Sequence, residues 1–211
     1  MSVPYRIHPK KTKIIQFSST NDQYKWYLDG NEITTKEDAI HLRIIRSEKN
    51  ECSKNIEARL ENARRTQYAL IGSGFYGTNG IDAVTSYKLY HTYVLPRLIY
   101  GLEVLPLKTK HVENLETFHR KSIRYLQSLP QRIATAAIYL LVGAIPIEAE
   151  LHKRKLSLLY SMLASDNLKI KEIINRQISV SYDNEDSFFC SIRYILILYD
   201  LPSITDLHQI M

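Results

Sequence analysis

The sequence lacks the aspartate pair that would suggest two-metal phosphoryl chemistry. That chemistry needs carboxylates that converge on paired cations, and its commonest sequence sign is a pair of closely spaced aspartates on a strand. No Asp-Asp pair occurs in the 211 residues. Asp183 and Asp186 lie in a polar stretch, where we expect contact with solvent and helix capping. We therefore identify no candidate catalytic residue.

The histidines and the glycine-rich stretch predict no other catalytic site. Neither His119, at the edge of an apolar helix face, nor His111, in an expected linker, has a Cys or His at metal-ligand spacing. A Ser-His-Asp arrangement assembled by the fold stays open, but no Gly-x-Ser-x-Gly elbow is present. Gly72-Ser73-Gly74 lacks the Lys and the Ser or Thr of a Walker loop, so it predicts an interhelical loop. We expect no metal ion and no cofactor in this chain.

Basic residues gather on one side of a helix that the pattern predicts over residues 113–129. With Leu115 as the reference direction, the apolar residues of this helix cluster together. Arg120, Lys121 and Arg124 occupy the opposite side, within an arc of about 100° at the helical period. Such a face is either simply solvated or follows the phosphates of a nucleic acid. We take these three cations as candidate nucleic-acid contacts.

Two other basic clusters differ in what they predict. Lys10, Lys11 and Lys13 stand just before the first expected strand, where they could meet a backbone phosphate or form a solvated N-terminus. Lys155 falls within the apolar arc of its helix, so we expect its stem to be buried and its amine to reach solvent.

Three short strands are expected in the first 50 residues. Apolar runs over residues 14–17, 24–28 and 39–45 are separated by polar and turn-forming residues. The second run is followed by Asp29-Gly30, which is a strong hairpin-turn signal. These runs predict a small antiparallel β element.

From Glu51 onward the apolar period changes to that of helices. The first helix is expected to end at Gly72-Ser73-Gly74. Asp82 is the expected N-cap of the second, which Pro96 should kink because its ring clashes with a carbonyl of the preceding turn. Further helices are expected over residues 113–129, 133–141, 148–164, 168–178 and 187–199, with a short turn after Pro202. The predicted fold is α+β, with a small β element over residues 1–50 and a mainly helical bundle over residues 51–211.

The composition is that of an ordinary globular protein. Hydrophobic residues make up 45%, charged residues 24%, and the net charge is +6. The charge permits nucleic-acid contact without establishing it. The cysteines Cys52 and Cys190 form no paired framework, and no signal peptide or membrane-spanning stretch is evident. We expect an intracellular protein of the cytoplasm or nucleus that is not secreted and has no membrane partner.

Read as a string, the sequence resembles the reverse transcriptases of non-LTR (LINE-type) retrotransposons. Residues 8–17 (HPKKTKIIQF) are similar to the family's Asn-x-x-Lys-Thr segment, and residues 26–33 (WYLDGNEI) and 41–44 (HLRI) to the two palm strands that follow. Residues 93–103 (YVLPRLIYGLE) are the most characteristic stretch of the helical part, and residues 115–130 also fit the pattern. The family's Asn is His8 here, and its Gly is Arg43.

The resemblance covers nearly the whole chain but only the C-terminal portion of the family. It implies a palm remnant over residues 1–50, and a thumb with C-terminal helices over residues 51–211. The parent enzymes are RNA-directed DNA polymerases that use Mg²⁺ held by an aspartate pair, which this chain lacks. We therefore expect the chain to contact template and primer without polymerising alone, with the N-terminal part of the polymerase as a further partner.

Particular residues acquire roles from this resemblance. Lys11 corresponds to the motif lysine near the incoming triphosphate, with Lys13 in the same segment, and Leu42 lies where the primer strand is gripped. The cations Arg120, Lys121 and Arg124 would face template and primer from the thumb. Two alternatives remain: a basic helical module of retroelement origin that still binds nucleic acid, or a relic whose helices serve only protein contacts.

Overall fold

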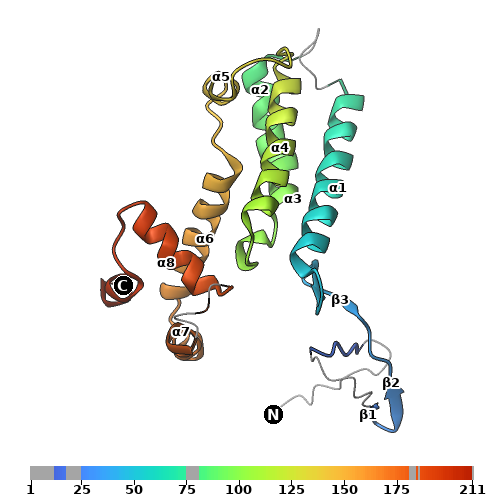
Figure 1. Ribbon diagram of the computed structural model, residues 1–211, viewed down its shortest axis with the longest axis vertical. Coiled ribbons are helices and arrows are strands. Elements are labelled where there is room, and N and C mark those ends of the chain that lie inside the picture. The colour runs from blue at the N-terminus through green and yellow to red at the C-terminus, as the bar shows by residue number, and fades with distance from the viewer. Residues whose placement is uncertain (1–11, 18–24, 75–80, 181–183, 185, 211) are drawn as a thin grey trace. The chain divides into compact units, whose positions relative to one another are not determined.

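The computed structural model describes residues 12–17, 25–74, 81–180, 184 and 186–210 (Figure 1). Two compact units make up the chain, over residues 1–55 and 56–211. The first carries strands and the second is helical, so the predicted α+β fold class is confirmed. Lys11 lies outside the described residues.

The first unit contains two separate antiparallel hairpins rather than three strands. Its strands are β1 (Trp26–Leu28), β2 (Asn31–Ile33), β3 (Asp38–His41) and β4 (Ile44–Ser47). β1 pairs with β2, and β3 with β4. The expected strand over residues 14–17 is wrong, because there only Ile14 forms a β-bridge, to Thr35.

The expected strand over residues 39–45 is also wrong, because a turn at Leu42-Arg43 divides it into β3 and β4. His41 pairs with Ile44, so the loop has two residues, whose φ angles are +49° and +63°. Asp29-Gly30 forms the equivalent predicted turn between β1 and β2, with φ angles of +49° and +79°. A two-residue loop with both φ angles positive matches the twist of the hairpin but strains residues other than Gly, Asn and Asp.

A buried asparagine ties the second hairpin to the first turn of α1 (Glu51–Gly72). The Asn55 side chain accepts a hydrogen bond from the Ile45 N–H at 2.9 Å and donates to the Ile45 carbonyl at 2.7 Å. Ion pairs join Lys54 to Asp38 and Arg46 to Glu51. The amide group of Asn55 thus satisfies the backbone groups of β4 that β3 leaves unpaired.

The second unit contains the rest of α1 and a series of shorter helices. Their bounds are α2 (Ala83–Leu89), η2 (Tyr90–Val94), α3 (Leu95–Ile99), η3 (Leu102–Val104), α4 (Thr109–Leu126), α5 (Thr135–Leu140), α6 (Ile147–Leu163), α7 (Leu168–Val180), α8 (Phe188–Leu198) and α9 (Ile204–Ile210). The predicted helices are therefore present, with ends that differ by a few residues. α4 begins before residue 113, so His111 is helical rather than part of a linker.

One local prediction in the second unit, the cap at Asp82, is confirmed. Asp82 caps α2 by accepting hydrogen bonds from the N–H groups of Val84 and Thr85. Pro96 is the second residue of α3, which follows the π-helical turn η2, and the Leu95 N–H reaches the Tyr90 carbonyl five residues back. A π turn before proline is a known way for a helix to accommodate the missing hydrogen bond and the bulky ring.

The core of the helical unit lies on both sides of α4 and continues into the C-terminal helices. In Figure 1, α4 runs beside α1 and in front of α2 and α3. Apolar side chains of α3 and α4 are fully buried, including Leu98, Ile99, Leu115 and Ile123. A second buried cluster joins α6, α7 and α8 and consists of Leu159, Leu163, Ile174, Ile192 and Leu196.

Among the helices in the described part of the chain, none has the length and apolar character needed to cross a membrane.

Candidate nucleic-acid interface

The three candidate cations of α4 do not share one surface. Lys121 is exposed and lines a groove against α1. Arg120 lies on another side of α4, where its Nε is 3.9 Å from Glu116 Oε1. Arg124 is partly buried, and its Nε has no hydrogen-bond partner among the described residues. The three cations therefore have different surroundings, although the helical period places them on one side of α4.

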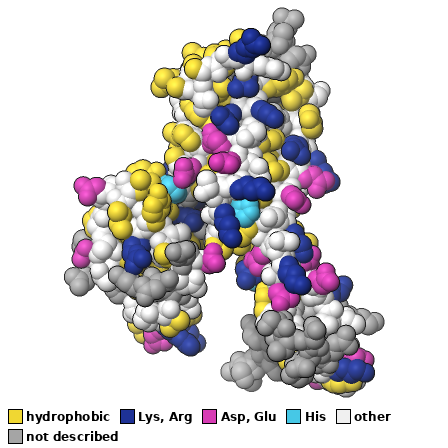
Figure 2. Space-filling model, viewed as in Figure 1, with side chains coloured by type: hydrophobic (Ala, Val, Ile, Leu, Met, Phe, Trp, Pro, Cys, Tyr) yellow, Lys and Arg dark blue, Asp and Glu magenta, His cyan; other side chains and the backbone are white. Residues whose placement is uncertain are grey.

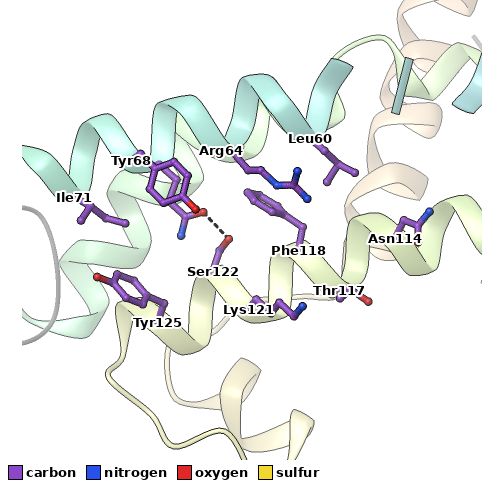
Figure 3. Close-up of a pocket in the computed structure, with 11 residues that line it drawn as sticks. Leu60, Arg64, Tyr68, Ile71, Asn114, Thr117, Phe118, Lys121, Ser122 and Tyr125 are labelled. Carbon is purple, nitrogen blue, oxygen red and sulfur yellow. Dashed lines mark hydrogen bonds between the residues drawn. The ribbon is translucent and has the colours of Figure 1, made fainter. Parts of the chain in front are cut away.

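A groove between α1 and α4 combines cations with aromatic rings. It has a volume of about 690 Å³, within the range of ligand-binding pockets. Figure 3 shows α1 forming one wall and α4 the other. The lining residues are Leu60, Arg64, Gln67, Tyr68 and Ile71 from α1, and Asn114, Thr117, Phe118, Lys121, Ser122 and Tyr125 from α4.

The charge of the groove is entirely positive. Arg64 contributes one cation from α1 and Lys121 another from α4, and none of the described lining residues is acidic. Neither cation has an ion-pair partner among the described residues, whereas the neighbouring Arg65 pairs with Glu61. Because these two charges are not neutralised within the protein, they can attract a phosphate.

A hydrogen bond across the floor joins the two walls of the groove. Ser122, which is buried, donates to Gln67 Oε1 at 2.8 Å, as the dashed line in Figure 3 shows. On the far side of α1, Arg97 Nη1 donates to Thr66 Oγ1 at 2.7 Å and so ties α1 to α3. A side-chain hydrogen bond thus joins α1 to α4 in addition to their apolar packing.

On the side of α4 that carries Arg120, the carboxylate of Glu116 connects α4 to neighbouring helices. Glu116 accepts hydrogen bonds from the Tyr139 hydroxyl and, at 2.8 Å, from the Ile147 N–H at the start of α6. Burial, followed by the hydrogen bond to Glu116, raises the pKa of the Tyr139 hydroxyl, which therefore stays protonated. With Glu116 engaged in this way, Arg120 helps to neutralise a carboxylate that holds α4 to α5 and α6.

A second cavity of about 450 Å³ lies between α4, α6 and α8, and its lining includes Glu113, Glu148 and Lys155. The expectation that the Lys155 amine reaches solvent is wrong, because the side chain is buried and its Nζ donates to Ser191 Oγ at 3.0 Å. Burial lowers the pKa of this amine. Carboxylates on the rim of this cavity make it a poor site for a polyanion.

His119 is a core residue rather than the edge residue that the helical pattern suggests. Its Nδ1 is 2.8 Å from the Tyr90 hydroxyl and its Nε2 is 3.1 Å from the Ile145 carbonyl. A carbonyl only accepts, so Nε2 carries the proton and Nδ1 accepts from Tyr90. Burial lowers the pKa of the imidazole, which therefore remains neutral.

The remaining predicted contact residues lie in the first unit. Lys13 is exposed, and Leu42 occupies the β3–β4 turn with 71% of its surface exposed.

Sequence analysis missed Arg64, Tyr68 and Tyr125 as members of a site. A signal was present, since Leu60, Arg64 and Tyr68 recur every four residues along one side of α1. That spacing alone does not tell which helix lies opposite. The facing row on α4 becomes part of the same groove only through the packing of the two helices.

The rest of the surface is mixed in charge. Figure 2 shows Lys and Arg side chains spread over the face of the helical unit that carries α4, with some carboxylates and hydrophobic side chains among them. Within the described parts of the chain, no group of three or more His, Cys, Asp and Glu side chains is arranged to hold a metal ion. Comparisons with protein-family models, with curated proteins and with solved structures each return no match.

Proposed function

We propose that this chain is a palm-and-thumb portion of a non-LTR-type reverse transcriptase that contacts nucleic acid and does not polymerise alone. The observation that supports contact most directly is the α1–α4 groove, which holds the unpaired cations Arg64 and Lys121 and no acidic side chain among its described lining residues. The family assignment itself rests on the resemblance in the sequence. The proposal that the chain does not polymerise alone rests on the absence of an Asp-Asp pair from the sequence.

In this proposal the two cations meet neighbouring phosphates of template or primer. Each side chain reaches the groove from a different helix, and the Ser122–Gln67 hydrogen bond holds those helices together. A phosphate backbone that enters between them can therefore contact both cations at once. Such contacts are independent of base sequence. They weaken as the salt concentration rises, because releasing counterions from the nucleic acid then gains less entropy.

The test is salt-dependent binding, measured by fluorescence anisotropy with labelled oligonucleotides. If both cations contact phosphates, Arg64→Gln with Lys121→Gln should reduce the slope of log K against log salt by about 1.4 to 1.8, at roughly 0.7 to 0.9 per phosphate. The matched control is Arg65→Gln with Arg120→Gln. This double variant also removes one cation from α1 and one from α4, but each of these cations already pairs with a carboxylate. A slope equally reduced in both double variants, or in neither, would contradict the assignment of the groove.

A second candidate function is protein contact, favoured by exposed apolar side chains of α8 and the segment after it. Tyr194, Ile197, Leu198 and Leu201 are each between 44% and 73% exposed. Contiguous exposed apolar side chains are typical of interaction surfaces. If no salt-dependent binding to any oligonucleotide is detected, this surface becomes the better basis for a function.

A further inference from the structure

We infer that the α1–α4 groove takes an unpaired strand, with bases stacked on Tyr68 and Tyr125. The inference rests on the proposed function, since it names the form of nucleic acid that the same groove binds. Tyr68 belongs to the α1 wall and Tyr125 to the α4 wall. Both rings are largely exposed, at 69% and 51%.

The groove places its two cations next to its aromatic rings. Figure 3 shows Arg64 extending toward Phe118, with Lys121 one turn further along α4, and Tyr68 and Tyr125 toward the Ile71 end. Among the described residues, Tyr68 and Tyr125 stack on no other aromatic ring, and both rings are exposed enough to meet a ligand. Cations beside exposed ring faces suit a strand, in which phosphates and bases lie next to one another.

This arrangement favours an unpaired strand over a duplex. In a duplex each base face is covered by its neighbours in the stack, so a protein ring gains nothing from it without unstacking the helix. In a single strand the bases can turn outward, and stacking on aromatic side chains then adds to the phosphate contacts. Two exposed tyrosines beside two unpaired cations therefore fit the single-stranded form better than the paired one.

The groove is already formed before a strand binds. The hydrogen bond between Ser122 and Gln67 joins the two walls, and the contact between Arg97 and Thr66 fixes the other side of α1. Both walls are thus held before binding, which lowers the entropic cost of association. The side chains of the two cations and the two tyrosines would still lose rotational freedom.

The experiment compares Tyr→Leu variants on single strands and duplexes. Oligo(dA) and oligo(rA) of equal length serve as unpaired probes, with a blunt DNA duplex as the paired one. Each of Tyr68→Leu and Tyr125→Leu should weaken binding of the unpaired probes about fivefold or more, because stacking contributes on that scale per base, and should leave the salt slope unchanged. Tyr68→Phe and Tyr125→Phe should retain binding, and Tyr160→Leu, at an exposed position of α6, should have no effect.

The outcomes separate this inference from the proposed function. If the Arg64 and Lys121 variants reduce the salt slope while the Tyr→Leu variants bind as the parent does, the groove binds phosphates but not stacked bases, and the inference is wrong. Tighter binding of the duplex than of both unpaired probes would also overturn it. If neither the charge variants nor the tyrosine variants change binding, the proposed function and the inference both fail. Different affinities for oligo(dA) and oligo(rA), with the same response to Tyr→Leu, would support stacking and identify the preferred sugar.

Discussion

The Tyr90 hydroxyl donates a hydrogen bond to Nδ1 of His119, at 2.8 Å, in the centre of the helical unit. The two residues come from neighbouring helical segments, η2 and α4, and both are almost completely buried. Together with the contact from His119 Nε2 to the Ile145 carbonyl, the pair links α4 to two other parts of the chain. This linkage depends on a neutral imidazole.

The free energy of unfolding should therefore fall as the pH drops below about 6.5. Burial lowers the pKa of His119 in the folded state, whereas the unfolded chain binds a proton near the ordinary histidine value. The unfolded state then holds more protons in this range, so acid favours it, by at most about 1.4 kcal/mol per pH unit for one group. Stability is highest above that range. The ionisable groups that influence His119 are Tyr90, Tyr139, Glu116, Glu150 and His91.

Urea titrations between pH 5 and 7.5 test this prediction. His119→Gln should be less stable at pH 7.5 but should lose less stability on acidification than the parent protein. His152→Gln provides a comparison, because burial also lowers the pKa of His152 although that side chain is only partly buried. An identical pH dependence for the parent and His119→Gln would contradict the assigned role.

Arg43→Gly should raise the stability of the first unit. Arg43 has a φ of +63°, in the left-handed region where a side chain costs about 1 kcal/mol or more, and glycine removes that cost. Greater freedom of glycine in the unfolded chain offsets part of the gain. We expect a net increase of up to about 1 kcal/mol, measured by thermal melts that follow the β signal.

Gly30→Ala is the matched change in the other hairpin and should act in the opposite direction. Gly30 has a φ of +79°, and a Cβ there would meet nothing within 4 Å, so the expected loss comes from the backbone alone. A lower melting temperature for Arg43→Gly would show that residue 43 is not in a strained turn in solution.

Asn55→Ala should release the second hairpin from α1. The substitution leaves the N–H and the carbonyl of Ile45 without their side-chain partner, at a cost of about 1 to 3 kcal/mol for each group that stays buried. Hydrogen exchange by NMR should show the Ile45 amide losing protection at least tenfold. Asn62→Ala, at an exposed position of the same helix, is the control and should leave that amide protected.

The chain should not extend a primer on an RNA template with Mg²⁺ or Mn²⁺. Phosphoryl transfer by two metal ions requires carboxylates that hold both cations, and the sequence contains no Asp-Asp pair. The measurement is primer extension after rigorous removal of host polymerases, with a mock preparation as the baseline. Incorporation above that baseline would refute the prediction.

Features that depend on neighbours in the chain could be predicted from the sequence. The end of α1 at Gly72, the cap at Asp82 and the hairpin turn at Asp29-Gly30 are short-range signals, and the structure contains each of them. The helical period likewise identified the apolar side of α4, whose buried residues include Leu115 and Leu126. Such signals suffice because capping, turn geometry and amphipathic periodicity involve residues only a few positions apart.

The candidate site was decided by tertiary structure. The helical period places Arg120 and Lys121 on one arc of α4, but Glu116 engages the first while α1 brings Arg64 and Tyr68 opposite the second. His119 likewise becomes a hydrogen-bonded core residue only because Tyr90 packs against it from 29 positions away. A periodicity describes one helix by itself, whereas the charge, burial and partners of a side chain depend on which helix packs against it. That choice is made by long-range contacts, which are not visible in the spacing of residues along a single helix.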